Sequence, residues 1–114
     1  TVLGSVTPAM DVFQSELFGP VLAVTTFRDE DEAVELANGT EFGLAAGIWT
    51  SDLGRAHRVA RRVVAGTAWV NTYRAMNFSL PFGGTRSSGY GRVNGMDGFA
   101  EFTQTNQINV NLRG

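Results

Sequence analysis

Between residues 21 and 71, apolar runs alternate with segments whose apolar positions recur at helical spacing. The runs 21–27 and 44–49 are rich in β-branched and other apolar side chains, which is typical of buried strands. Gly19-Pro20 precedes the first run and acidic residues follow it. A third run spans 67–71. These runs predict three strands.

The two segments between these strands carry helix signals. The acidic run 29–32 suits the positive end of a helix dipole, and Asn38-Gly39 marks the end of that helix. Residues 50–52 are N-cap candidates for a second helix, which is predicted to end at Gly66 and whose apolar residues between positions 53 and 64 form one stripe. Short connections predict a β-α-β-α-β unit with parallel strands.

The chain changes character after residue 72. Residues 73–95 are aromatic and glycine-rich, which predicts a long irregular segment, and a short helix is expected over 96–102. Residues 107–112 alternate polar and apolar side chains, which predicts a half-buried strand. Because parallel strands are normally covered on both faces, elements outside these 114 residues should complete the core.

Composition removes several chemistries. The chain has no cysteine, all nine of its basic residues are arginine, and His57 is its single histidine. A thiolate nucleophile, a disulfide, a cysteine zinc site and a lysine Schiff base are therefore absent, and no metal site is expected. His57 has no acidic neighbour in sequence, so we interpret it as a surface residue without a catalytic role.

The charge balance bears on partners and location. Eleven acids against nine arginines give a net charge of −2, which is opposite to the usual footprint of a nucleic-acid-binding protein. No apolar run approaches the roughly 18 residues of a membrane span, and no signal peptide pattern opens the chain. We therefore expect no nucleic acid, no membrane and a cytoplasmic location. The chain begins with Thr1 rather than Met, which suggests an excised piece.

Two segments resemble known functional motifs but lack a required residue. Gly89-Tyr-Gly91 begins like the dinucleotide-binding pattern G-x-G-x-x-G, but Asn94 occupies the last glycine position. Ser87 and Ser88 do not form G-x-S-x-G, because Thr85 stands where its first glycine belongs. We interpret both serines as turn residues and assign no catalytic residue to this chain.

Five other short motifs, taken together and in this order, are more specific for one protein family. They are Glu16-Leu-Phe-Gly-Pro20, Phe42-Gly-Leu-Ala-Ala-Gly47, Gly66-Thr-Ala-Trp-Val-Asn71, Pro81-Phe-Gly-Gly84 and Ser88-Gly-Tyr-Gly-Arg92. Together they resemble the last quarter of the NAD(P)-dependent aldehyde dehydrogenase superfamily, over nearly the whole chain. The resemblance implies that residues 1–104 are the C-terminal part of the catalytic domain and that 105–114 are an oligomerisation arm.

The resemblance also implies a chemistry. In that family a cysteine thiolate attacks an aldehyde, hydride passes to the nicotinamide of NAD or NADP, and a glutamate activates the water that hydrolyses the thioester. Those residues lie upstream of the region matched here, so this chain alone is expected to be inactive. By motif, Glu16 would hold the nicotinamide-ribose hydroxyls and Phe18 would pack beside the nicotinamide.

The stretch 74–82 would match the loop that lines the substrate tunnel, with Arg74, Met76 and Phe82 as candidate contacts. A cation at Arg74 would favour an aldehyde that bears a carboxylate, although a surface or inter-subunit salt bridge is the alternative. Val93 departs from the family, which has an acidic residue there, and Arg86 stands where lysine is common.

Two functions are therefore carried forward. The first is the C-terminal part of an enzyme that oxidises an aldehyde to a carboxylic acid and assembles as a homo-oligomer. The second is a non-enzymatic α/β module whose exposed strand edges recruit copies of itself. Micromolar NAD binding by the chain alone would contradict the expectation that one wall of the cofactor site holds little of the ligand.

Overall fold

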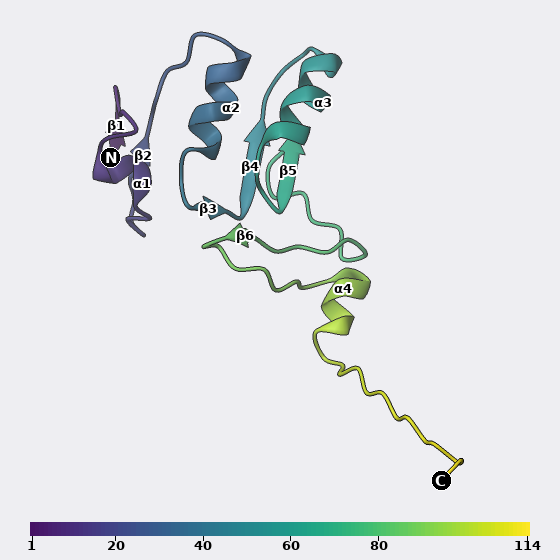
Figure 1. The fold of residues 1–114 in the computed structure, drawn as a ribbon. Helices are drawn as coiled ribbons and strands as arrows, with labels where there is room; N and C mark the ends of the chain where they lie inside the picture. Colours follow the sequence, from purple (N-terminus) through teal and green to yellow (C-terminus); the bar gives the residue numbers. More distant parts are fainter.

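A computed structural model describes residues 1–114, and its elements confirm the α/β class (Figure 1). In chain order they are β1 (Val2–Leu3), α1 (Asp11–Gln14), β2 (Leu22–Ala23), α2 (Glu30–Asn38), β3 (Phe42–Gly43), β4 (Ala45–Ile48), α3 (Leu53–Arg62), β5 (Thr67–Val70), β6 (Thr85–Arg86) and α4 (Gly95–Ala100).

The predicted parallel pairing is confirmed for two of the three strands. β4 and β5 run parallel, with Ala45 opposite Thr67 and Ile48 opposite Val70. The prediction of one three-stranded sheet is wrong for this chain, because β2 pairs with β1 in a sheet of its own. β1 is only two residues long, too short to show a periodic pattern in the sequence.

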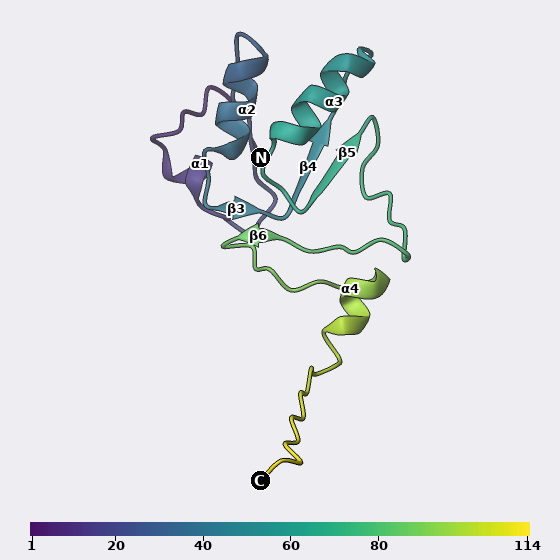
Figure 2. The ribbon, with the colours of Figure 1, turned by 45° about the vertical axis from the view of Figure 1, so that its right-hand side comes forward.

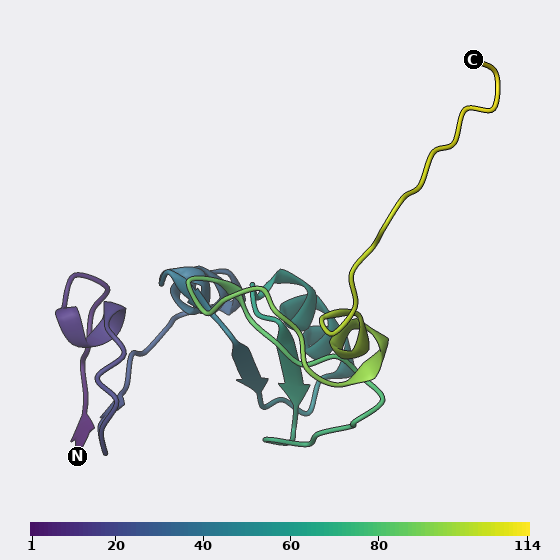
Figure 3. The same cartoon turned by 90° about the horizontal axis from the view of Figure 1, so that it is seen from below.

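The prediction that 21–27 is a buried strand is also wrong for this chain. Only Leu22 and Ala23 are in β2, and Leu22, Val24 and Phe27 are 59%, 40% and 61% exposed. The β1–β2 ribbon lies to one side of the layer that contains β4 and β5 (Figure 3). The apolar residues Val2, Leu3 and Leu22 of this ribbon are 68%, 37% and 59% exposed.

Both long helices begin where the acidic residues predict. The Asp29 side chain accepts a hydrogen bond from the Glu32 amide at 2.9 Å, and the Asp52 side chain accepts one from the Arg55 amide at 3.0 Å. Each carboxylate thus satisfies an amide that the first turn of a helix leaves without a partner. The predicted start of α2 at the acidic run and the predicted N-cap of α3 within residues 50–52 are therefore confirmed.

The end of α3 differs from the prediction. The helix stops at Arg62 rather than Gly66, and Val63 is extended. Asn38 accounts for this difference, since its side chain donates to the Arg62 carbonyl at 2.9 Å and accepts from the Val64 amide at 2.7 Å. The Asn38 side chain at the end of α2 therefore binds backbone groups that would otherwise continue α3, and the helix ends there.

The core is small. α3 packs on β4 and β5 and against α2 (Figure 2), and the buried apolar residues are Val6, Val34 and Ala56. The chain exposes 9013 Å², whereas a compact monomer of 12.3 kDa exposes about 6100 Å². The excess matches the expectation that other elements cover these strands.

The segment after α4 runs away from the body of the molecule (Figure 1), and the longest axis of the chain is 72 Å. Residues 107–112 form no strand pairing, and Ile108, Val110 and Leu112 are 80%, 73% and 91% exposed. The prediction of a half-buried strand is therefore wrong for the single chain, which offers these residues no neighbouring strand. No helix combines the length and the apolar character needed to cross a membrane.

Candidate functional site

The turn between α1 and β2 presents Glu16 and Phe18. Phe18 is 93% exposed and has a φ of 51°, a backbone conformation that costs a bulky residue roughly 1–2 kcal/mol. The turn is held at its far end, because the Thr1 amino group donates to the Pro20 carbonyl at 2.7 Å and the Leu22 amide donates to the Thr1 carbonyl at 2.9 Å. An exposed ring on a strained, anchored turn is a candidate contact for a ligand.

Glu16 lies beside Phe18 on this turn, and both line a cavity of about 280 Å³. Glu16 also borders a second cavity, of about 630 Å³, whose other walls include the start of β4 and Ser88. All ion pairs of the chain use Glu30, Asp31 or Glu32, so the Glu16 carboxylate has no cationic partner. It is free to accept hydrogen bonds from a ligand.

A second group of candidates follows the carboxyl end of β5. Asn71 has a φ of 52°, and its side chain accepts from the Thr50 amide at 2.9 Å and donates to the Thr50 carbonyl at 2.8 Å. Trp69 Nε1 donates to the Ala75 carbonyl at 3.0 Å. These bonds hold residues 71–75 at both ends. The sequence motifs gave no indication of this arrangement.

Arg74 lies in this held segment. The centre of its guanidinium lies 5.3 Å from the centroid of the Tyr73 ring, and that ring meets Trp69 edge-on at 5.6 Å and 75°. Arg74 has a φ of 56° and takes part in no ion pair of the chain. The salt bridge that was the alternative interpretation of Arg74 does not form within this chain.

Met76 and Phe82 share a cavity of about 430 Å³ that Trp69 also lines. Phe82 is half-buried, and its backbone exchanges two hydrogen bonds with Val93, at 2.8 and 2.9 Å. The Val93 side chain is 58% exposed. Val93 therefore fixes Phe82 through its backbone, a role that does not depend on its side chain.

The glycine-rich segment packs backbone against backbone. A Cβ on Gly66 would overlap the Gly83 carbonyl, and a Cβ on Gly83 would overlap the Gly91 carbonyl. Ser88 Oγ accepts from the Gly43 amide at 3.0 Å, across the β3–β6 pair. The interpretation of the serines as turn residues fits these contacts, although the antiparallel pairing of β3 and β6 had no recognisable sequence pattern.

Two arginines of this segment bind main-chain carbonyls. Arg86 Nη1 donates to the carbonyls of Asn38 and Thr40 at 2.8 and 2.7 Å, which satisfies groups at the end of α2. Arg92 Nη1 donates to the Gly84 carbonyl at 2.7 Å. Both guanidinium groups are structural here.

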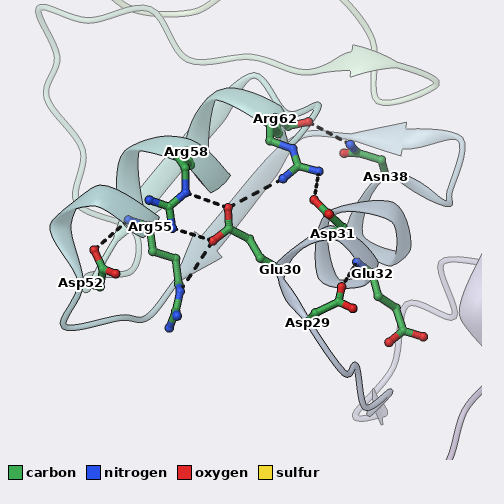
Figure 4. Close-up of polar contacts among 9 residues, drawn as sticks. All are labelled: Asp29, Glu30, Asp31, Glu32, Asn38, Asp52, Arg55, Arg58 and Arg62. Carbon is green, nitrogen blue, oxygen red and sulfur yellow. Dashed lines mark hydrogen bonds and ion pairs between the residues drawn. The ribbon is translucent and has the colours of Figure 1, made fainter.

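The acidic residues at the start of α2 form an ion-pair cluster with α3 (Figure 4). Glu30 pairs with Arg58 at 2.9 Å and with Arg55 and Arg62 at 3.7 Å, and Arg62 also pairs with Asp31 at 2.7 Å. The hydrogen bond from Arg58, with help from the charges of Arg55 and Arg62, holds the pKa of Glu30 below its usual value. The Asp31 side chain is 84% exposed, whereas the Glu30 side chain is only 23% exposed and lies among the three arginines.

No cluster of histidine, cysteine, aspartate and glutamate could hold a metal ion. His57 is exposed. The structure thus groups Glu16 with Phe18, and Met76 with Phe82. Arg74 is stacked on Tyr73 and lines neither of these two cavities, although the next residue, Ala75, lines the cavity of Met76 and Phe82. Neither cavity includes a residue of the other pair.

Comparisons with known proteins cover almost the whole chain. Residues 1–108 match the model of the aldehyde dehydrogenase family. The betaine aldehyde dehydrogenase 1 of Rhizobium meliloti (strain 1021) is 46% identical over 112 residues, which are 98% of this chain and 23% of that protein. The chain therefore spans about a quarter of the length of such relatives.

Solved structures agree with the sequence matches. The NAD-dependent aldehyde dehydrogenase of Sinorhizobium meliloti superposes with a TM-score of 0.89 at 44% identity, over 99% of this chain and 22% of that one. An indole-3-acetaldehyde dehydrogenase solved with NAD⁺ gives a TM-score of 0.87 at 44% identity, over 90% of this chain and 21% of that one. The separate small sheets of this chain thus resemble one part of these larger solved structures.

Proposed function

Because this chain belongs to the aldehyde dehydrogenase family, we propose that it forms the C-terminal part of an enzyme that oxidises an aldehyde to a carboxylic acid with NAD or NADP. In this reaction the aldehyde carbon gives a hydride to the cofactor and water supplies the second oxygen. The products are a carboxylate, the reduced cofactor and two protons. The family match over residues 1–108 is the observation that carries the proposal.

Glu16 and Phe18 form one wall of the cofactor site in this proposal. A carboxylate accepts two hydroxyl hydrogen bonds from a ribose, and the Glu16 carboxylate has no competing cation. The exposed Phe18 ring would exclude water beside the nicotinamide, where the hydride moves. Bound NAD or NADP supplies the hydride acceptor; relatives solved with NAD⁺ support NAD as the first cofactor to test.

Residues 74–82 form the substrate wall. Met76 and Phe82 line a cavity together with Trp69, which gives an aldehyde an apolar surface. Arg74 directly precedes Ala75, which lines the same cavity, and it lies on the segment that Asn71 and Trp69 hold in place. The catalytic cysteine and the water-activating glutamate would come from the rest of the enzyme.

We assign residues 1–104 to the catalytic domain and 105–114 to an oligomerisation arm that pairs with another subunit. The support for the arm is the alternation of exposed apolar side chains at 108, 110 and 112 with polar ones. A homo-oligomer in the cytoplasm completes the proposal, and cell fractionation tests its location.

The test compares the full-length protein with the 114-residue chain, using NAD and NADP with a neutral aldehyde. We expect formation of the reduced cofactor, followed by its absorbance, with the full-length protein and none with the chain alone. Turnover by the pure chain would refute the assignment of the nucleophile to the rest of the enzyme.

The rival function is a self-associating module without enzymatic activity. The exposed edges and apolar faces of β1, β2, β4 and β5 favour it, because they call for a covering partner. A full-length protein that oligomerises but oxidises no aldehyde with either cofactor would support the rival and refute the enzyme.

A further inference from the structure

We propose that Arg74, held on the Tyr73 ring, is a recognition site for a carboxylate, so that the substrate is an aldehyde carrying a carboxylate at its far end. The inference rests on the proposed function and specifies its substrate class. It starts from the place of Arg74 in the fold. Arg74 follows the carboxyl end of β5, and in open α/β sheets ligands bind outside the carboxyl ends of the strands.

The backbone at Arg74 is strained and yet fixed. Its φ of 56° is unfavourable for a residue with a side chain. The Asn71 side chain holds one end of the segment on Thr50, and Trp69 Nε1 holds the other end at the Ala75 carbonyl. Strain that the surroundings sustain is concentrated at functional positions, which favours a role for this side chain.

The guanidinium itself is positioned and available. Its centre lies 5.3 Å from the Tyr73 centroid, and Trp69 supports that ring edge-on. Stacking on an aromatic face leaves the hydrogen-bond donors of arginine at its rim free. Arg28, Arg55, Arg58 and Arg62 pair with acids, and Arg86 and Arg92 bind carbonyls. Arg61, Arg74 and Arg113 have neither kind of partner, and of these three Arg74 alone is stacked on an aromatic ring.

The chemistry of this position selects a carboxylate. One planar guanidinium matches the two oxygens of a carboxylate and balances its single charge. Ala75, the residue after Arg74, lines a cavity of about 430 Å³ together with Met76 and Phe82, and this cavity suits the apolar part of such a substrate. The same cation repels a quaternary ammonium group. This enzyme should therefore reject the cationic aldehyde for which its betaine aldehyde dehydrogenase relatives are named.

The experiment uses the full-length protein and matched aldehydes: succinate semialdehyde, the longer adipate semialdehyde, the methyl ester of each, and betaine aldehyde. We expect kcat/KM for at least one free acid to exceed that for its ester by about 10- to 100-fold, the range typical of a hydrogen bond between charged groups. Betaine aldehyde should be the poorest substrate. Equal values for acids and esters would overturn the inference.

Three variants test the residue. Arg74→Asn removes the charge while tolerating a positive φ, so the loop should keep its shape. It should lower kcat/KM for the free acid to about the value for its ester, mainly through a higher KM for the acid, because the carboxylate lies away from the reacting carbon. Arg74→Lys should retain part of the preference. Arg61→Asn, an exposed arginine of α3, is the control and should change nothing.

The outcomes separate the two proposals. A protein that oxidises the esters with NAD or NADP but shows no preference for an acid keeps the proposed function and loses this inference. A preference that survives in Arg74→Asn also overturns the role of Arg74. A protein that oxidises none of the aldehydes refutes both.

Discussion

The Glu30 carboxylate accepts two hydrogen bonds from Arg58, from Nε to Oε1 at 3.1 Å and from Nη2 to Oε2 at 2.9 Å (Figure 4). This two-point contact joins the first turn of α2 to the middle of α3. Glu30 also lies at the positive end of the α2 dipole, which favours its charge. The relative placement of the two helices therefore depends on an ion pair as well as on apolar packing.

Replacing Glu30 with glutamine should loosen α2 from α3. Glutamine keeps the shape but removes the charge that Arg55, Arg58 and Arg62 share. We expect faster hydrogen–deuterium exchange in peptides covering both helices of the full-length protein, by a modest factor because the pair is near solvent. Glu35→Gln, an exposed position of α2 without an ion pair, is the control. Equal exchange in the two variants would contradict the prediction.

The contribution of Glu30 should depend on pH. Its pKa is lowered in the folded chain, chiefly by the hydrogen bond from Arg58, so the unfolded state binds a proton more readily. The stabilisation is therefore complete above the unfolded value, about 4.5, and is lost as the pH falls through the folded value. The difference in thermal midpoint between the wild type and Glu30→Gln should be constant near neutral pH and shrink in acid. A difference that grew in acid would contradict this sign.

Asn38 should control where α3 ends. Asn38→Ala removes both bonds to the end of α3 and should lower the free energy of unfolding by about 1–3 kcal/mol, the usual cost of two such bonds. Asn38→Asp keeps an acceptor for the Val64 amide but loses the donor to Arg62, so its effect should be smaller. Denaturant unfolding of the full-length variants measures both. Equal losses of unfolding free energy in Asn38→Ala and Asn38→Asp would show that the bond from the Val64 amide contributes nothing to stability.

Adding one methyl group at Gly66 should destabilise the folded protein. Its Cβ would overlap the Gly83 carbonyl, so Gly66→Ala must displace the loop that leads to Arg86. We expect a loss of about 1–3 kcal/mol, as for other overpacked sites, together with weaker aldehyde oxidation because Phe82 shares that loop. Gly4→Ala is the control, since nothing lies near its Cβ position. A thermal midpoint of Gly66→Ala equal to that of the control would contradict the predicted overlap with Gly83.

The sequence predicted best what depends on near neighbours. The helix starts were predictable because Asp29 and Asp52 each bond an amide three residues ahead. The end of α3 was not, because Asn38 acts on it from 24 residues away. The pairing of β1 with β2 is likewise a long-range contact between very short strands.

The candidate site also depends on features that the local sequence does not reveal. Glu16 and Phe18 were found only through a resemblance, since a lone acid and a lone aromatic ring carry no local signal. The positive φ at Phe18 and at Arg74, and the stack of Arg74 on Tyr73, are visible only in three dimensions. Composition could exclude a cysteine nucleophile in this chain, but it could not show which arginine is stacked on an aromatic ring.

The segment after α4 should be needed for assembly of the full-length protein. Ile108 and Val110 are 80% and 73% exposed, and with Leu112 they lie at alternate positions, so an extended chain would place all three on one face. Ile108→Asp with Val110→Asp should reduce the subunit number measured by light scattering, because a charge on that face opposes pairing with another subunit. Asn109→Asp adds a charge to the opposite face and should leave the mass unchanged. If the double variant keeps the mass of the wild type, residues 105–114 are not the oligomerisation arm.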